Sequence, residues 1–442
     1  MSKDLELHRG RVFTLVGDPM RSHDVPLLQD SYHFSEDGAV LVDRKAGVVL
    51  AIGAWEELKE TKGARILDHR PHWIMPGLVD AHTHLPQYPV AGRGGLFLQD
   101  WLKRIIFPAE ARFQDVDYAR RIARLFFHRL AASGTTTAAV LSSVHEAATH
   151  AAFEEAQASG LRVFLGKVMM DCHGPSEILE TTSASMEASN RLCEAWDGKN
   201  DGLLRYLYTP RFALTCSREL LEACGREARD RRVGTQTHIN EVPGESTQAL
   251  HVHPWAKHYT AIYLETGIIG ANHLSILAHE IYPKPDELQV LWNLPVAIAH
   301  CPTANAALRS GEFDFMKVYT RGLDRIALGS DVGAGASLSM FDVMRGAQGI
   351  GRNELSLLQL YYLATMGGAR SLGVKSGSLL AGYEADFIVV DPRVCFPDPE
   401  VENLHFEDVL AIMIGRGAEK EGLVRKTYVR GNKVYEWKKE TR

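Results

Sequence analysis

Residues 73–84 read WIMPGLVDAHTH. The apolar run WIMPGLV leads directly into His82-Thr83-His84, so this stretch is typical of a buried strand that ends in two imidazoles. Residues two positions apart on a strand point to the same side, so both rings can reach one metal ion. In a barrel of parallel strands, functional side chains lie at the carboxyl ends of the strands. This stretch therefore predicts the first strand of a barrel with a metal site at its mouth.

Further apolar, strand-like runs follow along the chain, and helical patterns lie between most of them. The clearest helical patterns cover residues 117–133 and 355–373, where apolar residues recur every three or four positions. The strand-like runs are TTTAAVLSS (135–143), RVFLGKVMM (162–170), LLRYLYTP (203–210), VGTQTHI (233–239), LSILAH (274–279), VAIAH (296–300) and RIALGSD (325–331). Strands that alternate with helices in this way predict an α/β fold, a (β/α)8 TIM-like barrel over residues 74–375.

Both ends of the chain have a different character, because they are rich in short β-branched runs broken by Gly and Asp. Examples are RGRVFTLVG (9–17) and AVLVDRKAGVVLAIG (39–53) near the amino end, and GYEADFIVVDP (382–392) and VRKTYVRGNKVYEW (424–437) near the carboxyl end. Two β-rich ends around a different middle predict a small β-sandwich domain, built from residues 1–73 and 376–442 together.

Composition excludes several classes of protein. The chain has 442 residues, of which 45% are hydrophobic, and a formal net charge of −6, so it lacks the basic field that nucleic acid or an anionic membrane would attract. No apolar run is long enough to span a bilayer, and the amino end lacks a signal-peptide pattern. The six cysteines form no CxxC pair, so we expect reduced thiols and a cytoplasmic location.

Other strand ends carry metal-binding residue types as well. His238 and His279 end the fifth and sixth predicted strands, and Asp331 ends the eighth. Any one of them taken alone is more often a hydrogen-bonding or surface residue, but a set on separate strands is a rare accident. Imidazole and carboxylate together suit a divalent first-row metal such as zinc, although iron and manganese occupy similar sites. Residues 203–211 contain no Lys that could bridge two metals, so we expect one ion per subunit. His173 and His300, which also follow strands, stay open.

Longer motifs give a resemblance to a known family. PGLVDAHTH (76–84) resembles the entry motif of the amidohydrolase superfamily. HLPQYPVAGRGGLFLQDWLKRIIFPAEARF (84–113), YTPRFALTCS (208–217), QTHINE (236–241) and LGSDVGAGASLSMFDVMR (328–345) are similar to segments of its guanine deaminase family. The resemblance extends over essentially the whole chain.

The resemblance implies an activity and a set of site residues. The activity is the hydrolytic deamination of guanine to xanthine and ammonia at one zinc ion per subunit of a homodimer. The implied zinc ligands are His82, His84, His238 and Asp331, and the implied purine-binding residues are Gln87, Arg211 and Phe212. Glu241 is the implied proton shuttle, His279 a catalytic positioner, and Asp331 also the acceptor of the water's proton.

Two alternatives stay open from the residues themselves. Another amidohydrolase deaminase or chlorohydrolase, acting on 8-oxoguanine, a pterin or a triazine, would share the metal set, and a non-catalytic scaffold could share the fold. Arg211 has a simpler interpretation as a structural salt bridge at a strand end. The segment from 85 to 117 is too long for an ordinary loop, so we expect a lid or an interface there.

Overall fold

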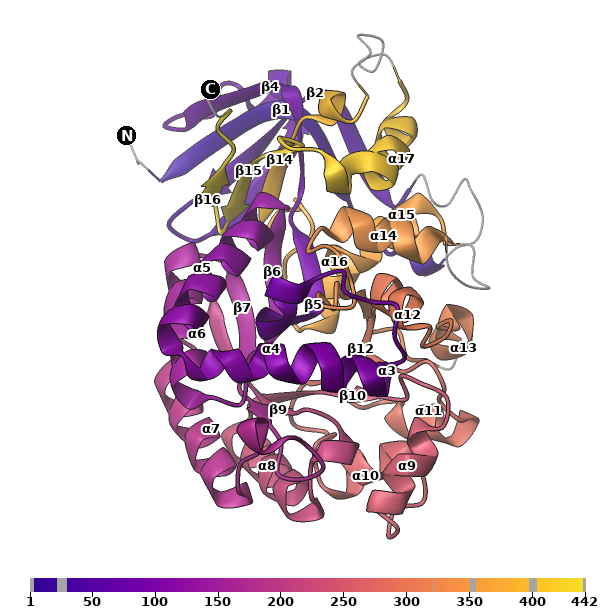
Figure 1. The fold of residues 1–442 in the computed structure, drawn as a ribbon. Coiled ribbons are helices and arrows are strands. Elements are labelled where there is room, and N and C mark those ends of the chain that lie inside the picture. Colours follow the sequence, from indigo (N-terminus) through magenta and orange to yellow (C-terminus); the bar gives the residue numbers. More distant parts are fainter. Residues whose placement is uncertain (1–3, 22–29, 321, 350–354, 397–403, 440–442) are drawn as a thin grey trace.

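The computed structural model describes residues 4–21, 30–320, 322–349, 355–396 and 404–439. Its larger part is a barrel of parallel strands (Figure 1). Neighbouring strands of the barrel follow the order β13-β12-β11-β10-β9-β7-β6-β5. The strands on this path are β5 (Leu78–His84), β6 (Thr135–Leu141), β7 (Arg162–Gly166), β9 (Leu204–Pro210), β10 (Gly234–Ile239), β11 (Ser275–His279), β12 (Val296–His300) and β13 (Ile326–Leu328). A short strand, β8 (Val168–Met169), lies off this path and pairs with β9. All eight predicted strands are present, and the predicted TIM-like barrel is confirmed.

The first and last strands of the barrel meet through the loop that follows β13. The backbone N–H of Asp331 donates to the carbonyl oxygen of His82 at 2.9 Å. The side chain of Asp80 accepts from the Ser330 N–H at 2.9 Å and from its hydroxyl at 2.5 Å. Two segments that lie about 250 positions apart in sequence are thereby held side by side.

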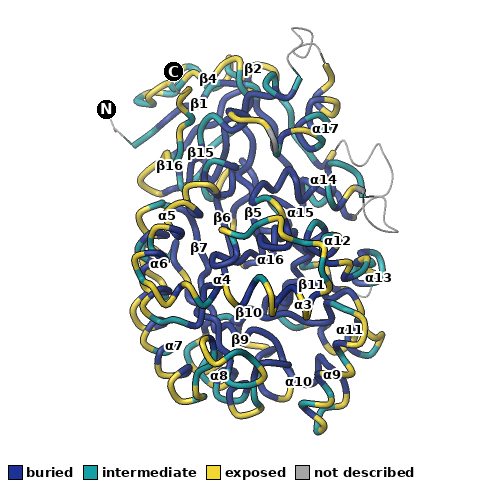
Figure 2. The backbone as a smooth tube through the Cα atoms, in the orientation of Figure 1, coloured by how far each residue is buried: buried dark blue, intermediate teal, exposed yellow. Residues whose placement is uncertain are grey.

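Helices cover the outside of the barrel. They are α5 (Val116–Ala132), α6 (Glu146–Ser159), α7 (Thr182–Trp196), α8 (Arg218–Arg231), α9 (Glu245–Val252), α10 (Tyr259–Glu265), α11 (Pro285–Leu291), α12 (Pro302–Leu308), α13 (Phe315–Tyr319), α14 (Met340–Gly349), α15 (Leu357–Leu363) and α16 (Met366–Ser371). Figure 2 shows the contrast between their partly exposed surfaces and the buried strands inside. None of the helices in the described ranges has the length and apolar character that crossing a membrane needs.

The two helices that the sequence predicts most clearly differ in outcome, one through its own capping residue and the other through a contact with β5. α5 begins where the side chain of Asp115 accepts hydrogen bonds from two free N–H groups of the first turn. The helix predicted for residues 355–373 is instead split into α15 and α16. The carbonyl oxygen of Ala364 accepts a hydrogen bond from the N–H of Val79 on β5 at 2.7 Å. The next residue, Thr365, has a non-helical backbone with φ −136° and ψ −102°.

The segment from 85 to 117 lies across the barrel mouth (Figure 1). It forms a 3-10 turn (Leu85–Val90), then α3 (Leu98–Trp101), a π-helical turn (Leu102–Ile106), α4 (Phe107–Ala111) and a final 3-10 turn (Arg112–Gln114). Its apolar side chains at positions 98, 101, 102, 106, 107 and 113 are buried in the main hydrophobic core. This insertion is therefore a packed wall of the barrel mouth.

The two chain ends form one mixed sheet in the order β16-β15-β14-β4-β1-β2-β3. Its strands are β1 (Leu5–Leu15), β2 (Tyr32–Asp43), β3 (Val48–Ala54), β4 (Arg65–Pro76), β14 (Phe387–Val390), β15 (Val424–Val429) and β16 (Asn432–Glu436). The carboxyl-terminal strands join through β14, which runs antiparallel to β4. The chain segments that form this sheet also contain the helices α2 (Trp55–Leu58) and α17 (Phe406–Arg416). The predicted small β domain from both ends is confirmed, and its strands belong to a single hydrogen-bonded sheet.

A buried cluster of charges joins this sheet to the barrel. Arg162 at the start of β7 is 3% exposed and donates to Asp386 and Glu384, which lead into β14. It also donates to the Thr137 hydroxyl at 3.1 Å, and Arg430 donates to Glu384 at 2.7 Å. Because Arg162 and Asp386 are buried and pair with each other, breaking this contact would leave a buried charge without its partner, and the contact helps to fix how the sheet sits on the barrel.

Candidate metal and substrate site

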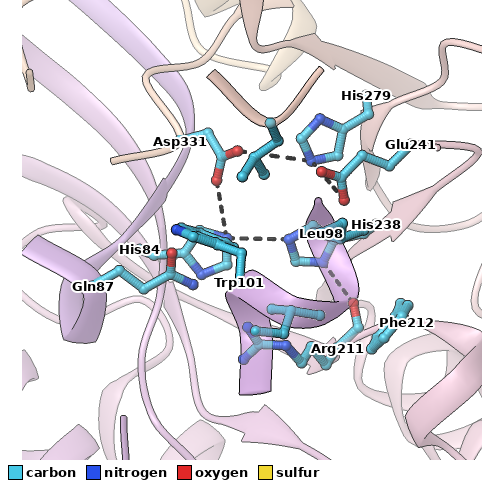
Figure 3. Close-up of a pocket in the computed structure, with 12 residues that line it drawn as sticks. His84, Gln87, Leu98, Trp101, Arg211, Phe212, His238, Glu241, His279 and Asp331 are labelled. Atoms are coloured by element: carbon cyan, nitrogen blue, oxygen red, sulfur yellow. Dashed lines mark hydrogen bonds and ion pairs between the residues drawn. The ribbon is translucent and has the colours of Figure 1, made fainter. Parts of the chain in front are cut away.

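Three imidazoles converge at the barrel mouth. His82 and His84 end β5, and His238 lies near the end of β10. Nε2 of His84 lies 3.2 Å from Nε2 of His82. It also lies 3.1 Å from Nε2 of His238, as Figure 3 shows. Two ligands that each lie about 2.0–2.1 Å from a tetrahedral ion are separated by about 3.3 Å. The spacing of these three nitrogens therefore fits a shared metal ion.

A carboxylate and a fourth imidazole complete the group. Oδ1 of Asp331 lies 3.3 Å from Nε2 of His84 and 3.5 Å from Nε2 of His82. Nε2 of His279 lies 3.9 Å from Oδ2 of Asp331. Ligand atoms of His82, His84 and His238 lie within 4.8 Å of one another, as do those of His82, His279 and Asp331. The residues predicted to hold the metal are thus brought together.

The protonation states suit a cation. Burial lowers the pKa values of His82 and His238, and it lowers the pKa of His84 to about 4, so the rings are neutral and have lone pairs to offer. Burial opposes the charge on Asp331, but hydrogen bonding to His82 and His84 outweighs it and holds its pKa well below the usual range. Neutral imidazoles with an ionised carboxylate are the donor set that divalent zinc-like metals bind.

Neighbouring groups fix the orientation of two of the rings. Nδ1 of His238 lies 2.6 Å from the backbone carbonyl oxygen of Arg211, which leaves its Nε2 facing the other ligands. Nδ1 of His279 lies 2.9 Å from Oδ1 of Asn305 on α12. Such contacts set the tautomer of each ring, so the metal-facing nitrogen is the one without a hydrogen.

Glu241 follows β10 and reaches the same mouth. Its Oε2 lies 3.7 Å from Nε2 of His279, and its Oε1 accepts from the Ser310 hydroxyl at 3.4 Å. Glu245 anchors the loop, because its Oε2 accepts from the Glu241 N–H at 2.7 Å. Burial raises the pKa of Glu241 well above its usual value, and the nearby carboxylates of Glu245 and Asp331 raise it further. Glu241 and Asp331 are therefore driven toward opposite protonation states, which is the arrangement of an acid beside a base.

A pocket opens beside this group. Its walls carry both polar and apolar side chains, as small-molecule sites do. The barrel contributes the predicted purine-binding residues Arg211 and Phe212, which follow β9, and Gln87 begins the insertion (Figure 3). Apolar walls come from Leu98, Trp101, Leu102 and Leu308, of which the first three lie on the insertion. All the residues expected to recognise the substrate line one cavity with Glu241 and His279.

A buried carboxylate that sequence reasoning missed joins two of these residues. Oε2 of Glu110 on α4 accepts from Nη1 of Arg211 at 2.5 Å, and its Oε1 accepts from Nε2 of Gln87 at 3.1 Å. The salt bridge considered for Arg211 as a structural alternative does exist, but it lies inside the pocket wall. Glu110 stands within the FPAEARF segment (107–113), so its place in the motif was the only available signal.

Two histidines that stayed open lie outside the pocket lining. His173 is exposed, and its Nδ1 contacts the carbonyl oxygen of Leu214 at 2.9 Å. His300 is buried and stacks on Phe313 with ring centroids 4.6 Å apart. Burial lowers the pKa of His300 to about 3, so this ring is neutral.

Comparison with known proteins places the chain in a family. A model of the amidohydrolase family matches residues 73–434. The chain is 34% identical over 435 residues to a guanine deaminase of Escherichia coli K12, which covers 95% of this chain and 96% of that protein. It is 34% identical to the human guanine deaminase over 342 residues, or 74% of each chain.

A solved structure also has the same fold as this chain. A guanine deaminase from C. acetobutylicum, with guanine bound in its active site, superposes with a TM-score of 0.87 at 27% identity and covers 98% of this chain and 100% of that one. The family match, the similarity to guanine deaminases and the converging metal-binding side chains agree: the chain belongs to the amidohydrolase family.

Proposed function

We propose that this protein is a guanine deaminase, which converts guanine and water to xanthine and ammonia. One observation carries the proposal: a group suited to a single metal ion and the residues suited to a purine line the same pocket. The similarity to guanine deaminases over nearly the full chain supports the choice of substrate.

The reaction replaces the amine at C2 of guanine with oxygen. A metal bound by His82, His84, His238 and Asp331 would supply a nucleophilic water at neutral pH, because it lowers the pKa of that water to about 7. Burial raises the pKa of Glu241 well above its usual value, which favours its acid form, and we assign it the role of protonating the ring nitrogen N3 while the water oxygen bonds to C2.

Proton transfer then continues between the two carboxyl groups. Asp331, which is ionised, accepts the proton that the water loses. Glu241, now ionised, takes the proton of the new C2 hydroxyl while Asp331 passes its proton to the amine. The C2–N bond then breaks, ammonia leaves, and both carboxyl groups return to their starting states. His279 touches both carboxyl groups, at 3.7 Å from Glu241 and 3.9 Å from Asp331, and we assign it the role of positioning them.

Recognition of guanine needs groups that read its edge and cover its face. Arg211 is a buried donor that favours a carbonyl oxygen at C6 over an amine. The amide of Gln87 offers both a donor and an acceptor to the alternating edge of a purine. Phe212 supplies a flat apolar surface for the ring.

Four finer assignments belong to the same proposal. Zinc is the metal that the imidazole and carboxylate set favours, with one ion per subunit because β9 carries no Lys. A homodimer rests on the family resemblance, and a cytoplasmic location on the six free cysteines. Domain boundaries after residues 73 and 375 are the last of these assignments; β14 of the small sheet begins at Phe387, whereas β4 continues to Pro76 and crosses the first boundary.

The test is to follow guanine by its absorbance and ammonia by a coupled assay, with metal-loaded and chelated protein. We expect the loaded protein to consume guanine, the chelated protein to be inactive, and added zinc to restore activity. The panel includes 8-oxoguanine, adenine, cytosine and ammeline. Release of ammonia from one of these, with guanine untouched, would favour another deaminase of the family.

A further inference from the structure

Glu110 is the centre of a buried group that no catalytic step uses. It is 1% exposed, and its two partners are 3% exposed for Arg211 and 1% exposed for Gln87. Each of its two oxygens is engaged by a different partner, at 2.5 Å by Nη1 of Arg211 and at 3.1 Å by Nε2 of Gln87. Glu110 comes from the insertion, whereas Arg211 follows a barrel strand 101 positions later. One carboxylate therefore holds both polar side chains that face the purine.

The chemistry of a carboxylate decides which way the amide of Gln87 faces. An ionised carboxylate can only accept, so the nitrogen of Gln87 must face Glu110 and its oxygen must face elsewhere. That oxygen, Oε1, is buried and has no hydrogen-bond partner among the described residues. The amide nitrogen has a second hydrogen that Glu110 does not use. Gln87 thus keeps one acceptor and one adjacent donor for a ligand.

Space for this orientation is provided by a glycine. Gly333 has φ +133°, and a Cβ atom on it would lie 2.2 Å from Oε1 of Gln87. A larger residue at this position would push the amide out of its place. The oxygen therefore lies directly against Gly333, while the nitrogen is hydrogen-bonded to Glu110.

We propose that Glu110 is a positioning residue that makes this pocket read the lactam edge of a purine. The inference rests on the proposed function. In guanine the C6 oxygen accepts and the adjacent N1–H donates, which matches the donor and acceptor that Gln87 keeps. In 2,6-diaminopurine the same edge carries an amine at C6 and a bare N1, the reverse pattern. Both compounds have the C2 amine that is removed, so they differ only in the edge that Gln87 and Arg211 face.

Loss of the charge at Glu110 should weaken this discrimination. In Glu110→Gln the new amide can hydrogen-bond to either the oxygen or the nitrogen of the Gln87 amide. The Gln87 amide can therefore adopt the flipped orientation. Arg211 also loses its counterion. A hydrogen bond to a charged group contributes enough to change a rate about 10- to 100-fold. We expect kcat/KM for guanine to fall by that factor while kcat/KM for 2,6-diaminopurine is unchanged or rises.

The experiment measures the guanine to 2,6-diaminopurine ratio of kcat/KM in metal-loaded wild type, Glu110→Gln, Gln87→Ala and the double variant. We expect Glu110→Gln to lower the ratio at least tenfold, and to lower it by a clearly smaller factor in the Gln87→Ala background, because part of the effect passes through that amide and the rest through Arg211. Equal loss for both substrates, or an undiminished effect in the Gln87→Ala background, overturns the proposal.

Controls separate this outcome from misfolding and from failure of the proposed function. Glu155→Gln removes the same charge on α6, where Glu155 pairs with Arg124, and should leave the ratio unchanged. Glu110→Asp keeps a group that can only accept, so it should preserve the ratio within threefold; a tenfold change there also overturns the proposal. A wild type that releases no ammonia from guanine refutes the proposed function and this inference with it, whereas an active wild type with an unchanged ratio in Glu110→Gln refutes the inference alone.

Discussion

The exchange Glu241→Gln tests the assignment of the acid most directly. Glutamine has nearly the same shape, and its carbonyl can still accept from the Ser310 hydroxyl, which lies 3.4 Å from Oε1. The loop itself is held by Glu245 through the backbone N–H of residue 241, at 2.7 Å, and this contact does not involve the altered side chain. We therefore expect the thermal midpoint and the metal content to be unchanged.

The expected effect on rate is large, because an amide cannot supply the proton. General acid catalysis contributes about 10²- to 10⁴-fold, which corresponds to about 2.7–5.5 kcal/mol of barrier. The pH profile adds a second signature. Since burial and the charges of Glu245 and Asp331 raise the pKa of Glu241, its acid form is present below that pKa and is lost as pH rises through it. Wild-type kcat should fall on this alkaline limb, and Glu241→Gln should lack the limb.

The assay is steady-state guanine loss across pH, with metal content and circular dichroism measured on each sample. Glu312→Gln is the matched control, because Glu312 is an exposed carboxylate on the loop after α12 and does not line the pocket. The reasoning is refuted if Glu241→Gln keeps more than about a tenth of wild-type kcat, or if its pH profile retains the wild-type alkaline limb.

Three further predictions concern recognition, the metal and the domain contact. Arg211→Ala should lower kcat/KM for guanine by at least about 10²-fold, yet retain metal, because the carbonyl oxygen that contacts His238 at 2.6 Å belongs to the backbone; kinetics with metal analysis checks both. Chelation should abolish guanine turnover and zinc should restore it, as absorbance assays will show; activity that survives complete metal removal would contradict the metal assignment. Arg162→Ala should lower the free energy of unfolding by about 3–5 kcal/mol, because it leaves Asp386 buried without its cation. Denaturant titration measures this free energy. The double variant Arg162→Ala/Asp386→Ala should lose less free energy of unfolding than the sum of the losses in the two single variants.

The sequence was sufficient to predict the barrel because its signals are local. Each inner strand is a short apolar run, and the polar residue that ends it marks the carboxyl edge where sites form. His82, His84, His238 and Asp331 could be placed at one mouth by this rule alone, before any contact between them was known. The small domain followed in the same way from the β-branched character of both ends.

What the sequence did not reveal depends on contacts between distant residues. The link from Glu110 to Arg211 joins a helix of the insertion to the end of β9, and no periodicity reports such a pair. The break between α15 and α16 arises because Ala364 gives its carbonyl to β5 rather than to its own helix. Backbone conformation was equally hidden: His279 and Asp331 have φ values of 76° and 43°, a left-handed region that non-glycine residues rarely adopt. Such strain collects at functional sites and persists only where neighbours over-determine it, as the bond from the Asp331 N–H to His82 does here.

The barrel and the insertion contribute different parts of the proposed site, which explains why guanine deamination was hard to distinguish by sequence from the reactions of other deaminases or chlorohydrolases of the family. Every proposed metal ligand, together with Glu241, lies on or directly after a barrel strand, so chemistry depends on the part of the fold that a whole family shares. On the proposed function, recognition depends on a contact between the barrel and the insertion, because Glu110 on α4 is hydrogen-bonded to both Arg211 and Gln87. A relative that has the same metal-binding residues at its strand ends but a different insertion would be expected to activate water in the same way. It would lack the side chains proposed to recognise guanine. We therefore propose that the substrate class is set by three buried side chains that meet across the pocket wall, whereas the metal-binding residues alone specify only that a bond is hydrolysed.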